Sequence, residues 1–131
     1  MAKELTENQI QAAFFDWLAV HEKRFPELGL FYAIPNGANK SPAARGLFKR
    51  TGLKAGVPDV HLPVARAALG LWIEFKATKG KVSEEQARWL NDLFQLGHAT
   101  HVCRSWTEAA DITMDYLNLP LKRFGSNGST G

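Results

Sequence analysis

The sequence contains a single cysteine, Cys103, among its 131 residues. One cysteine cannot form an intrachain disulfide, and it argues against a cysteine-based zinc site, so we expect a reducing compartment. No apolar run approaches the roughly 18 residues that a membrane-spanning helix needs. The N-terminal residues are polar and do not resemble a signal peptide. These absences predict a cytoplasmic protein that makes no contact with a membrane.

The sequence also lacks an internal repeat and a linker between domains. Its residues are 45% apolar and include four Trp and eight Phe, which is enough for one packed core. The segment 124–131 is rich in Gly, Ser and Asn, a composition typical of a frayed chain end. We therefore expect one domain over residues 1–119 and a disordered tail over residues 120–131.

Helix-start signals recur along the chain and set the order of the expected elements. Capping-box spacing is found in Thr6 with Gln9, Ser83 with Gln86 and Ser105 with Glu108, and Ser41-Pro42 is a further helix start. We expect helices from Thr6 to about Lys23, Ser41 to Gly52, Ser83 to Gly97 and Ser105 to Asn118, and strands over 30–34, 59–62, 71–76 and 100–104. The first strand is expected to be buried, and the next two to form a hairpin. This order predicts an α/β domain with a central mixed sheet flanked by helices.

The strand expected over 71–76 carries an acid and a base at alternate positions. Period-two alternation places Trp72, Glu74 and Lys76 on one face, opposite an apolar face. A solvated face would account for this pattern by itself. In a hairpin, however, Asp59 would lie beside Glu74, and two adjacent carboxylates repel unless a cation intervenes. The pair therefore favours a hard divalent ion such as Mg²⁺, with Lys76 available to orient water or stabilise charge on a phosphate.

These residues resemble a known nuclease signature. Pro58-Asp59, followed by Glu74-Phe75-Lys76, is similar to the PD-(D/E)XK motif. A fuller set of blocks over about residues 5–117 resembles the VRR-Nuc (virus-type replication-repair nuclease) domain: Glu7-x-x-Ile10-Gln11, Pro35-Asn36-Gly37, Gly56-Val57-Pro58-Asp59, Ile73-Glu74-Phe75-Lys76 and Ser83-x-x-Gln86. The resemblance implies a restriction-endonuclease-like fold and hydrolysis of DNA phosphodiester bonds with Mg²⁺ or Mn²⁺, in replication, repair or recombination, in a bacterium or a phage-infected cell.

The resemblance also implies roles for individual residues. Asp59, Glu74 and the backbone carbonyl of Phe75 would bind metal, Lys76 would be the active-site base-like residue, and Gln86 and Glu7 would complete the catalytic set; no organic cofactor is expected. Ordinary structural roles remain open for three residues. Glu7 lies in the first turn of a helix, where acids are favoured, Gln86 completes a capping box, and Asn36 is a common turn former. His61 would share the strand face of Asp59, with or without a part in the site.

Basic residues cluster near this expected site. The net charge is +3, and the residues expected to contact DNA phosphates are Lys40, Arg45, Lys49, Arg50, Lys54, Lys79 and Lys81. A solvated charged face is the alternative. Since no helix is typical of base reading, we expect recognition of DNA structure rather than sequence. Two other functions remain open: a junction-resolving endonuclease that acts as a dimer, and a nucleic-acid-binding module without catalysis.

A homodimer is expected because a domain of this size has little surface for gripping two duplex arms. In the helix after Ser83, the expected core stripe is Ala87, Leu90, Leu93 and Phe94. Trp89 lies off this stripe. It is either exposed at an interface or packed on a loop of the same chain.

Overall fold

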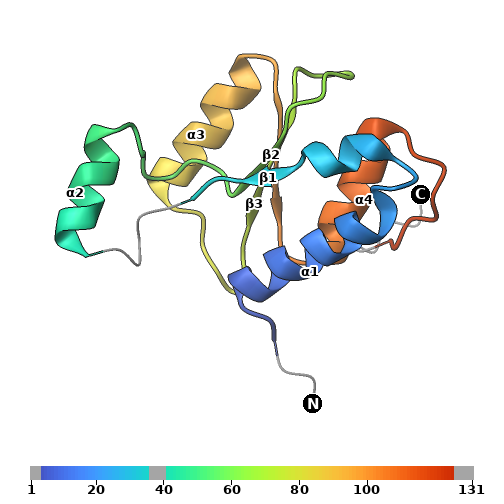
Figure 1. The fold of residues 1–131 in the computed structure, drawn as a ribbon, viewed down its shortest axis with the longest axis horizontal. Helices are drawn as coiled ribbons and strands as arrows, with labels where there is room; N and C mark the ends of the chain where they lie inside the picture. Colours follow the sequence, from blue (N-terminus) through green and yellow to red (C-terminus); the bar gives the residue numbers. More distant parts are fainter. Residues whose placement is uncertain (1–3, 36–40, 126–131) are drawn as a thin grey trace.

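The computed structural model describes residues 4–35 and 41–125, and of Arg45 and Phe48 the backbone alone. Its elements in chain order are α1 (Glu7–His21), the 3-10 helix η1 (Pro26–Leu30), β1 (Tyr32–Ala33), α2 (Pro42–Arg50), β2 (Val60–Leu62), β3 (Leu71–Phe75), α3 (Glu84–Gln95), β4 (Ala99–Cys103) and α4 (Trp106–Leu117). The predicted α/β class is confirmed, with a central mixed sheet flanked by helices (Figure 1). In the described part of the chain, no helix is long and apolar enough to cross a bilayer.

The four strands lie in the order β1-β2-β3-β4. β1 pairs antiparallel with β2, and β2 with β3, which confirms the predicted hairpin. β4 runs parallel to β3, so the chain must cross over between them, and α3 makes that connection. The register pairs Val60 with Ile73. Asp59 therefore lies directly across from Glu74 at the open end of the hairpin.

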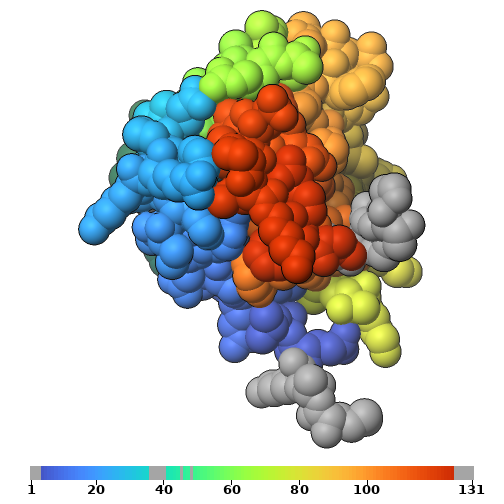
Figure 2. Space-filling model, turned by 90° about the vertical axis from the view of Figure 1, so that its right-hand side faces the viewer, coloured from blue at the N-terminus to red at the C-terminus, as the bar shows by residue number. Residues whose placement is uncertain are grey.

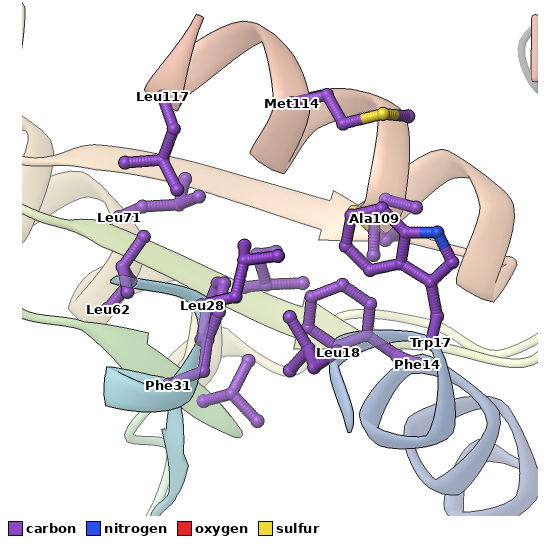
Figure 3. Packing of buried hydrophobic residues seen from close by; sticks show 14 of the residues in the cluster. Phe14, Trp17, Leu18, Leu28, Phe31, Leu62, Leu71, Ala109, Met114 and Leu117 are labelled. Carbon is purple, nitrogen blue, oxygen red and sulfur yellow. The ribbon is translucent and has the colours of Figure 1, made fainter. Parts of the chain in front are cut away.

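One face of the sheet is covered by α1 and α4. Their inward side chains include Phe14, Trp17 and Met114, which point at the apolar face of the strands (Figure 3). Phe14 is central, since its ring contacts those of Trp17, Phe31 and Phe75 at centroid separations of 5.2–6.1 Å. Burial of this kind stabilises the fold by about 1.5–3 kcal/mol per large apolar side chain.

The C-terminal segment follows α4 on the outside of this layer (Figure 2). Arg123 Nε donates to Asp115 Oδ1 over 2.6 Å, and the backbone N–H of Phe124 donates to Asp111 Oδ1 over 2.6 Å. Residues 121–124 thus contact α4, beyond the domain boundary predicted at residue 119, which stays a prediction. Residues 126–131 lie outside the described part.

The strand expected over 30–34 is shorter and more exposed than predicted. Leu30 ends η1, and β1 consists of Tyr32 and Ala33, both exposed. Pro26 starts the 3-10 turn. β1 lies at the edge of the sheet, where only Phe31 turns into the core. The apolar segment 30–34 is therefore not a buried strand.

The predicted core stripe of α3 is confirmed for Leu90 and Leu93 and wrong for Ala87 and Phe94. Ala87 is exposed and Phe94 is 63% exposed. The side chains that turn inward are Gln86, Trp89, Leu90 and Leu93, which have equally good helical spacing. The helix is rotated because its first turn faces the polar side of β3, so that a glutamine begins the inward face. Trp89 is half-buried, and its Nε1–H donates to the carbonyl of Ala55 over 3.1 Å.

Candidate active site

Asp59 is held by the loop that precedes β2. Gly56 in this loop has φ +87°, and a Cβ there would lie 2.8 Å from the backbone carbon of Glu85. Only glycine therefore allows the loop to rest on the first turn of α3. The Trp89 bond to Ala55 secures the same contact. The carboxylate of Asp59 then meets β3, where its Oδ2 accepts the backbone N–H of Phe75 over 2.7 Å.

Glu74 is only 2% exposed and Lys76 only 7%. The possibility of a solvated strand face is therefore wrong. Glu74 Oε2 accepts from Gln86 Nε2 over 3.0 Å and lies 3.9 Å from Lys76 Nζ. Glu74 Oε1 is buried and has no hydrogen-bond partner among the described residues. A buried carboxylate oxygen without a partner is costly, so this atom marks an incomplete site.

The two carboxylates cannot both be charged at low energetic cost. Burial raises the pKa of Glu74 to about 8, the charge of Asp59 adds to the effect, and Lys76 opposes it. Burial also raises the pKa of Asp59, although the N–H of Phe75 acts in the opposite direction. Such a pair binds a proton at neutral pH unless a cation takes its place.

The donor set fits a hard divalent cation. The N–H and C=O of one strand residue point to the same side, so the carbonyl of Phe75 faces Asp59 as its N–H does. Two carboxylates and a carbonyl are oxygen ligands of the kind Mg²⁺ takes, and water or phosphate commonly fills its other positions. No three His, Cys, Asp or Glu side chains converge on one point within the described ranges. Within the described ranges, the metal would therefore be held by two carboxylates and a backbone carbonyl, with positions left for water or phosphate.

Glu7 and Gln86 both approach the carboxylate pair. The charge of Glu7 contributes to raising the pKa of Asp59 and of Glu74. Its Oε2 would lie 3.3 Å from a Cβ added at Gly80, in the loop after β3. Gln86 combines the two roles left open by the sequence, because its Oε1 caps α3 at the N–H of Ser83 while its Nε2 donates to Glu74.

The predicted DNA-contacting residues that the structure describes are exposed, and they lie on two segments. Lys49 and Arg50 are exposed on α2, which projects away from the sheet in Figure 1, and Lys54 is exposed just after it. Lys79 and Lys81 are exposed in the loop after β3. Three other predicted residues are not covered: Asn36 and Lys40 lie outside the described residues, and so does the side chain of Arg45.

Arg104 is a residue that the sequence did not single out. Its Nη1 donates to the carbonyls of Ala77, Thr78 and Gly80 over 2.8, 3.3 and 2.7 Å, and thereby shapes the loop that carries Lys79. The backbone N–H of Arg104 donates to Glu108 Oε1. Ser105 caps α4, but the carboxylate of Glu108 does not return to Ser105 as the predicted capping box requires. No local sequence signal predicts these contacts.

Comparisons with known proteins agree with this architecture. The VRR-NUC domain family matches residues 5–106, a range that includes every described residue of the predicted catalytic set. Two solved chains match. One of them, described as a VRR_NUC domain protein, is 29% identical with a TM-score of 0.71, and the match covers 89% of this chain and 92% of that one. No curated protein matches. The likeness confirms the predicted α/β nuclease core.

Proposed function

The chain belongs to the VRR-NUC domain family, a family of nuclease type, and from this premise we propose that it is a metal-dependent DNA nuclease. It hydrolyses phosphodiester bonds at the site formed by Asp59, Glu74 and Lys76. The observation that carries the proposal is the buried, unpartnered Oε1 of Glu74 beside a second carboxylate. Perturbed acids of this kind concentrate at functional sites.

Mg²⁺ or Mn²⁺ would be held by Asp59, Glu74 and the Phe75 carbonyl. When bound, the ion supplies activation of water and stabilisation of charge on the phosphate oxygens. Gln86 fixes the carboxylate of Glu74 in one orientation through the 3.0 Å bond from its Nε2. Lys76, whose Nζ is 3.9 Å from that carboxylate, orients the attacking water or stabilises negative charge in the transition state.

DNA is the proposed substrate, recognised by structure rather than sequence. The exposed cations Lys49, Arg50, Lys54, Lys79 and Lys81 lie on α2, just after it, and in the loop after β3, and exposed cations of this kind can neutralise backbone phosphates. Recognition through phosphates positions a duplex without reading its bases. Such an activity suits DNA replication, repair or recombination in a bacterium or a phage-infected cell.

The decisive experiment incubates the protein with flap, nicked, junction and linear DNA, with Mg²⁺ or Mn²⁺ and with EDTA. Cleavage should require the metal and should be abolished by Asp59→Asn. Asp16→Asn, which changes an exposed acid on α1 in the same way, is the matched control. Full activity of Asp59→Asn, or activity in EDTA, would contradict the mechanism. DNA binding without cleavage by the unaltered protein would favour the non-catalytic module.

A junction-resolving dimer is the second candidate. Trp89 no longer supports it, because this residue packs on its own chain. The observation in its favour is the exposure of three large apolar side chains, Leu69 before β3 and Phe94 and Leu96 at the end of α3, which are 60–71% exposed. Sedimentation equilibrium at micromolar protein tests the dimer, and Phe94→Glu should dissociate it. A single 14.5 kDa species at all concentrations would exclude the dimer and symmetric cleavage of junctions by the free protein.

A further inference from the structure

Aromatic and imidazole rings form a row across the sheet beside the carboxylate pair. The register pairs Tyr32 of β1 with His61 of β2, and His61 with Trp72 of β3. His98, just before β4, extends the row. Neither the catalytic proposal nor the hydrophobic core includes these four side chains.

Each ring in the row contacts its neighbour by stacking, by an edge-on contact or by a hydrogen bond. The rings of His61 and Trp72 are stacked, with centroids 3.8 Å apart and planes 15° apart. Trp72 Nε1–H donates to His98 Nδ1 over 3.1 Å. The hydroxyl of Tyr32 hydrogen-bonds His61 Nδ1 over 2.8 Å, and the Tyr32 ring meets the His61 ring edge-on. Three rings are half-buried or better, whereas Tyr32 is 47% exposed at the sheet edge. The inner rings therefore hold an exposed aromatic ring in one orientation.

The row lies on the same sheet face as the carboxylates. Trp72 precedes Glu74 by two residues, and His61 follows Asp59 by two. Two residues of a strand span about 7 Å. A nucleotide adjoining a phosphate held at the carboxylates would thus reach the rings. All four side chains present flat aromatic rings, so they suit a nucleobase rather than another phosphate.

We propose that Tyr32, oriented by His61, Trp72 and His98, is a stacking platform for one unpaired nucleobase next to the phosphate that is cleaved. The inference rests on the proposed nuclease function of the same site. Aromatic side chains stack on bases of any sequence, since every base has a π face. Bases inside a duplex are already stacked on each other. The platform therefore gives the site a preference for DNA with an unpaired nucleotide near the point of cleavage.

The test measures DNA binding separately from cleavage. All variants are made in a Lys76→Met background with Mg²⁺, and intact DNA is verified on a denaturing gel. Two probes are used, a blunt duplex and the same duplex with a single-stranded overhang that carries 2-aminopurine at each position in turn. Anisotropy gives the affinity, and quenching of 2-aminopurine reports stacking. The variants are Tyr32→Ala, Tyr32→Leu, which keeps apolar bulk, and Tyr32→Phe, which keeps the ring.

Tyr32→Ala and Tyr32→Leu should weaken overhang binding on the order of tenfold, abolish the quenching and leave blunt-duplex binding within about twofold. Tyr32→Phe should retain most of both signals. Phe124→Ala is the matched control, because Phe124 is also 47% exposed and lies against α4. Three results would overturn the platform. The first is an equal loss of affinity for both probes, and the second is the absence of 2-aminopurine quenching by the protein that retains Tyr32. The third is a loss of affinity in Tyr32→Phe as large as in Tyr32→Ala.

The two proposals can fail independently. If the protein without substitutions cleaves DNA but binds both probes equally, the stacking platform is overturned and the nuclease stands. If it binds the overhang preferentially through Tyr32 but cleaves no DNA with either metal, the nuclease proposal is overturned and the stacking site stands.

Discussion

β3 separates two environments that are about equally inaccessible to water. On the side of α1 and α4, the side chains of Leu71, Ile73 and Phe75 are 0% exposed and belong to the hydrophobic core. On the other side, Glu74 and Lys76 are almost as well buried. Burial stabilises the first set, whereas the second set loses hydration that its single ion pair and hydrogen bonds replace only in part.

The difference separates residues kept for stability from residues kept for chemistry. An apolar residue at position 74 would satisfy the local packing without leaving Oε1 unpartnered. A carboxylate that is costly in the free protein gains a partner when a cation binds, because metal binding then contributes to folded-state stability. Substitutions on opposite faces of this one strand should therefore have opposite effects on cleavage and on stability.

Glu74→Gln should have the largest effect. It removes a proposed metal ligand, so the cleavage rate should fall on the order of a thousandfold or more, equivalent to about 4 kcal/mol in the transition state. The melting temperature without metal should stay or rise, because the amide is neutral at every pH and cannot become a buried charge beside Asp59. Initial rates and thermal melts test both halves, with Glu84→Gln in an exposed turn of α3 as control. If the variant retained cleavage and had a lower melting temperature, Glu74 would serve stability rather than chemistry, which contradicts the prediction.

Ile73→Ala changes the neighbouring residue on the other face. Deleting a fully buried aliphatic side chain should lower the free energy of unfolding by about 2–5 kcal/mol. Cleavage at a temperature where the variant remains folded should change little, since Ile73 points away from the carboxylates. Urea unfolding gives the stability, and Leu30→Ala, at an exposed position, serves as control. A variant of normal stability that has lost cleavage would contradict this prediction.

The pH dependence of the metal-free protein should report the polar face alone. The folded-state pKa of Glu74 is raised from 4.5 to about 8, so its contribution to stability is complete below pH 4.5 and is lost as the pH rises through about 8. The loss should be of the order of a few kcal/mol. Thermal melts in EDTA between pH 5 and 9 measure it, and the difference from Glu74→Gln isolates this group from the histidines. Mg²⁺ should restore stability most at high pH. The stability of the unaltered protein minus that of Glu74→Gln should fall as the pH rises, and a rise of this difference with pH would contradict the assignment.

A smaller effect is expected from the exposed cations of α2. Changing Lys49 and Arg50 together to Ala should reduce the slope of log affinity against log salt by about two, if each contacts a phosphate. Changing Lys23 and Arg24 together to Ala removes the same charge from exposed positions just after α1. An unchanged slope in the first variant, or equal changes in both, would mean that α2 is merely solvated.

The position of the carboxylate pair was more predictable than its surroundings. Asp59 and Glu74 meet through a short hairpin, where period-two alternation and turn position largely determine the register. The inward face of α3 could not be predicted because it starts at Gln86, and a polar residue counts against burial in any hydrophobic pattern. Arg104 binds carbonyls more than twenty residues away, a contact that depends on β4 lying parallel to β3.

The contact between Gly56 and Glu85 joins two parts of the site that are remote in sequence. The loop that delivers Asp59 and the helix turn that delivers Gln86 press on each other without an intervening side chain. They can therefore shift only together, and a methyl group at position 56 would push the loop that carries Asp59 away from the helix turn that carries Gln86. A mutational scan scored on cleavage should register Gly56 as strongly as a catalytic residue, although the residue has no side chain with which to touch DNA.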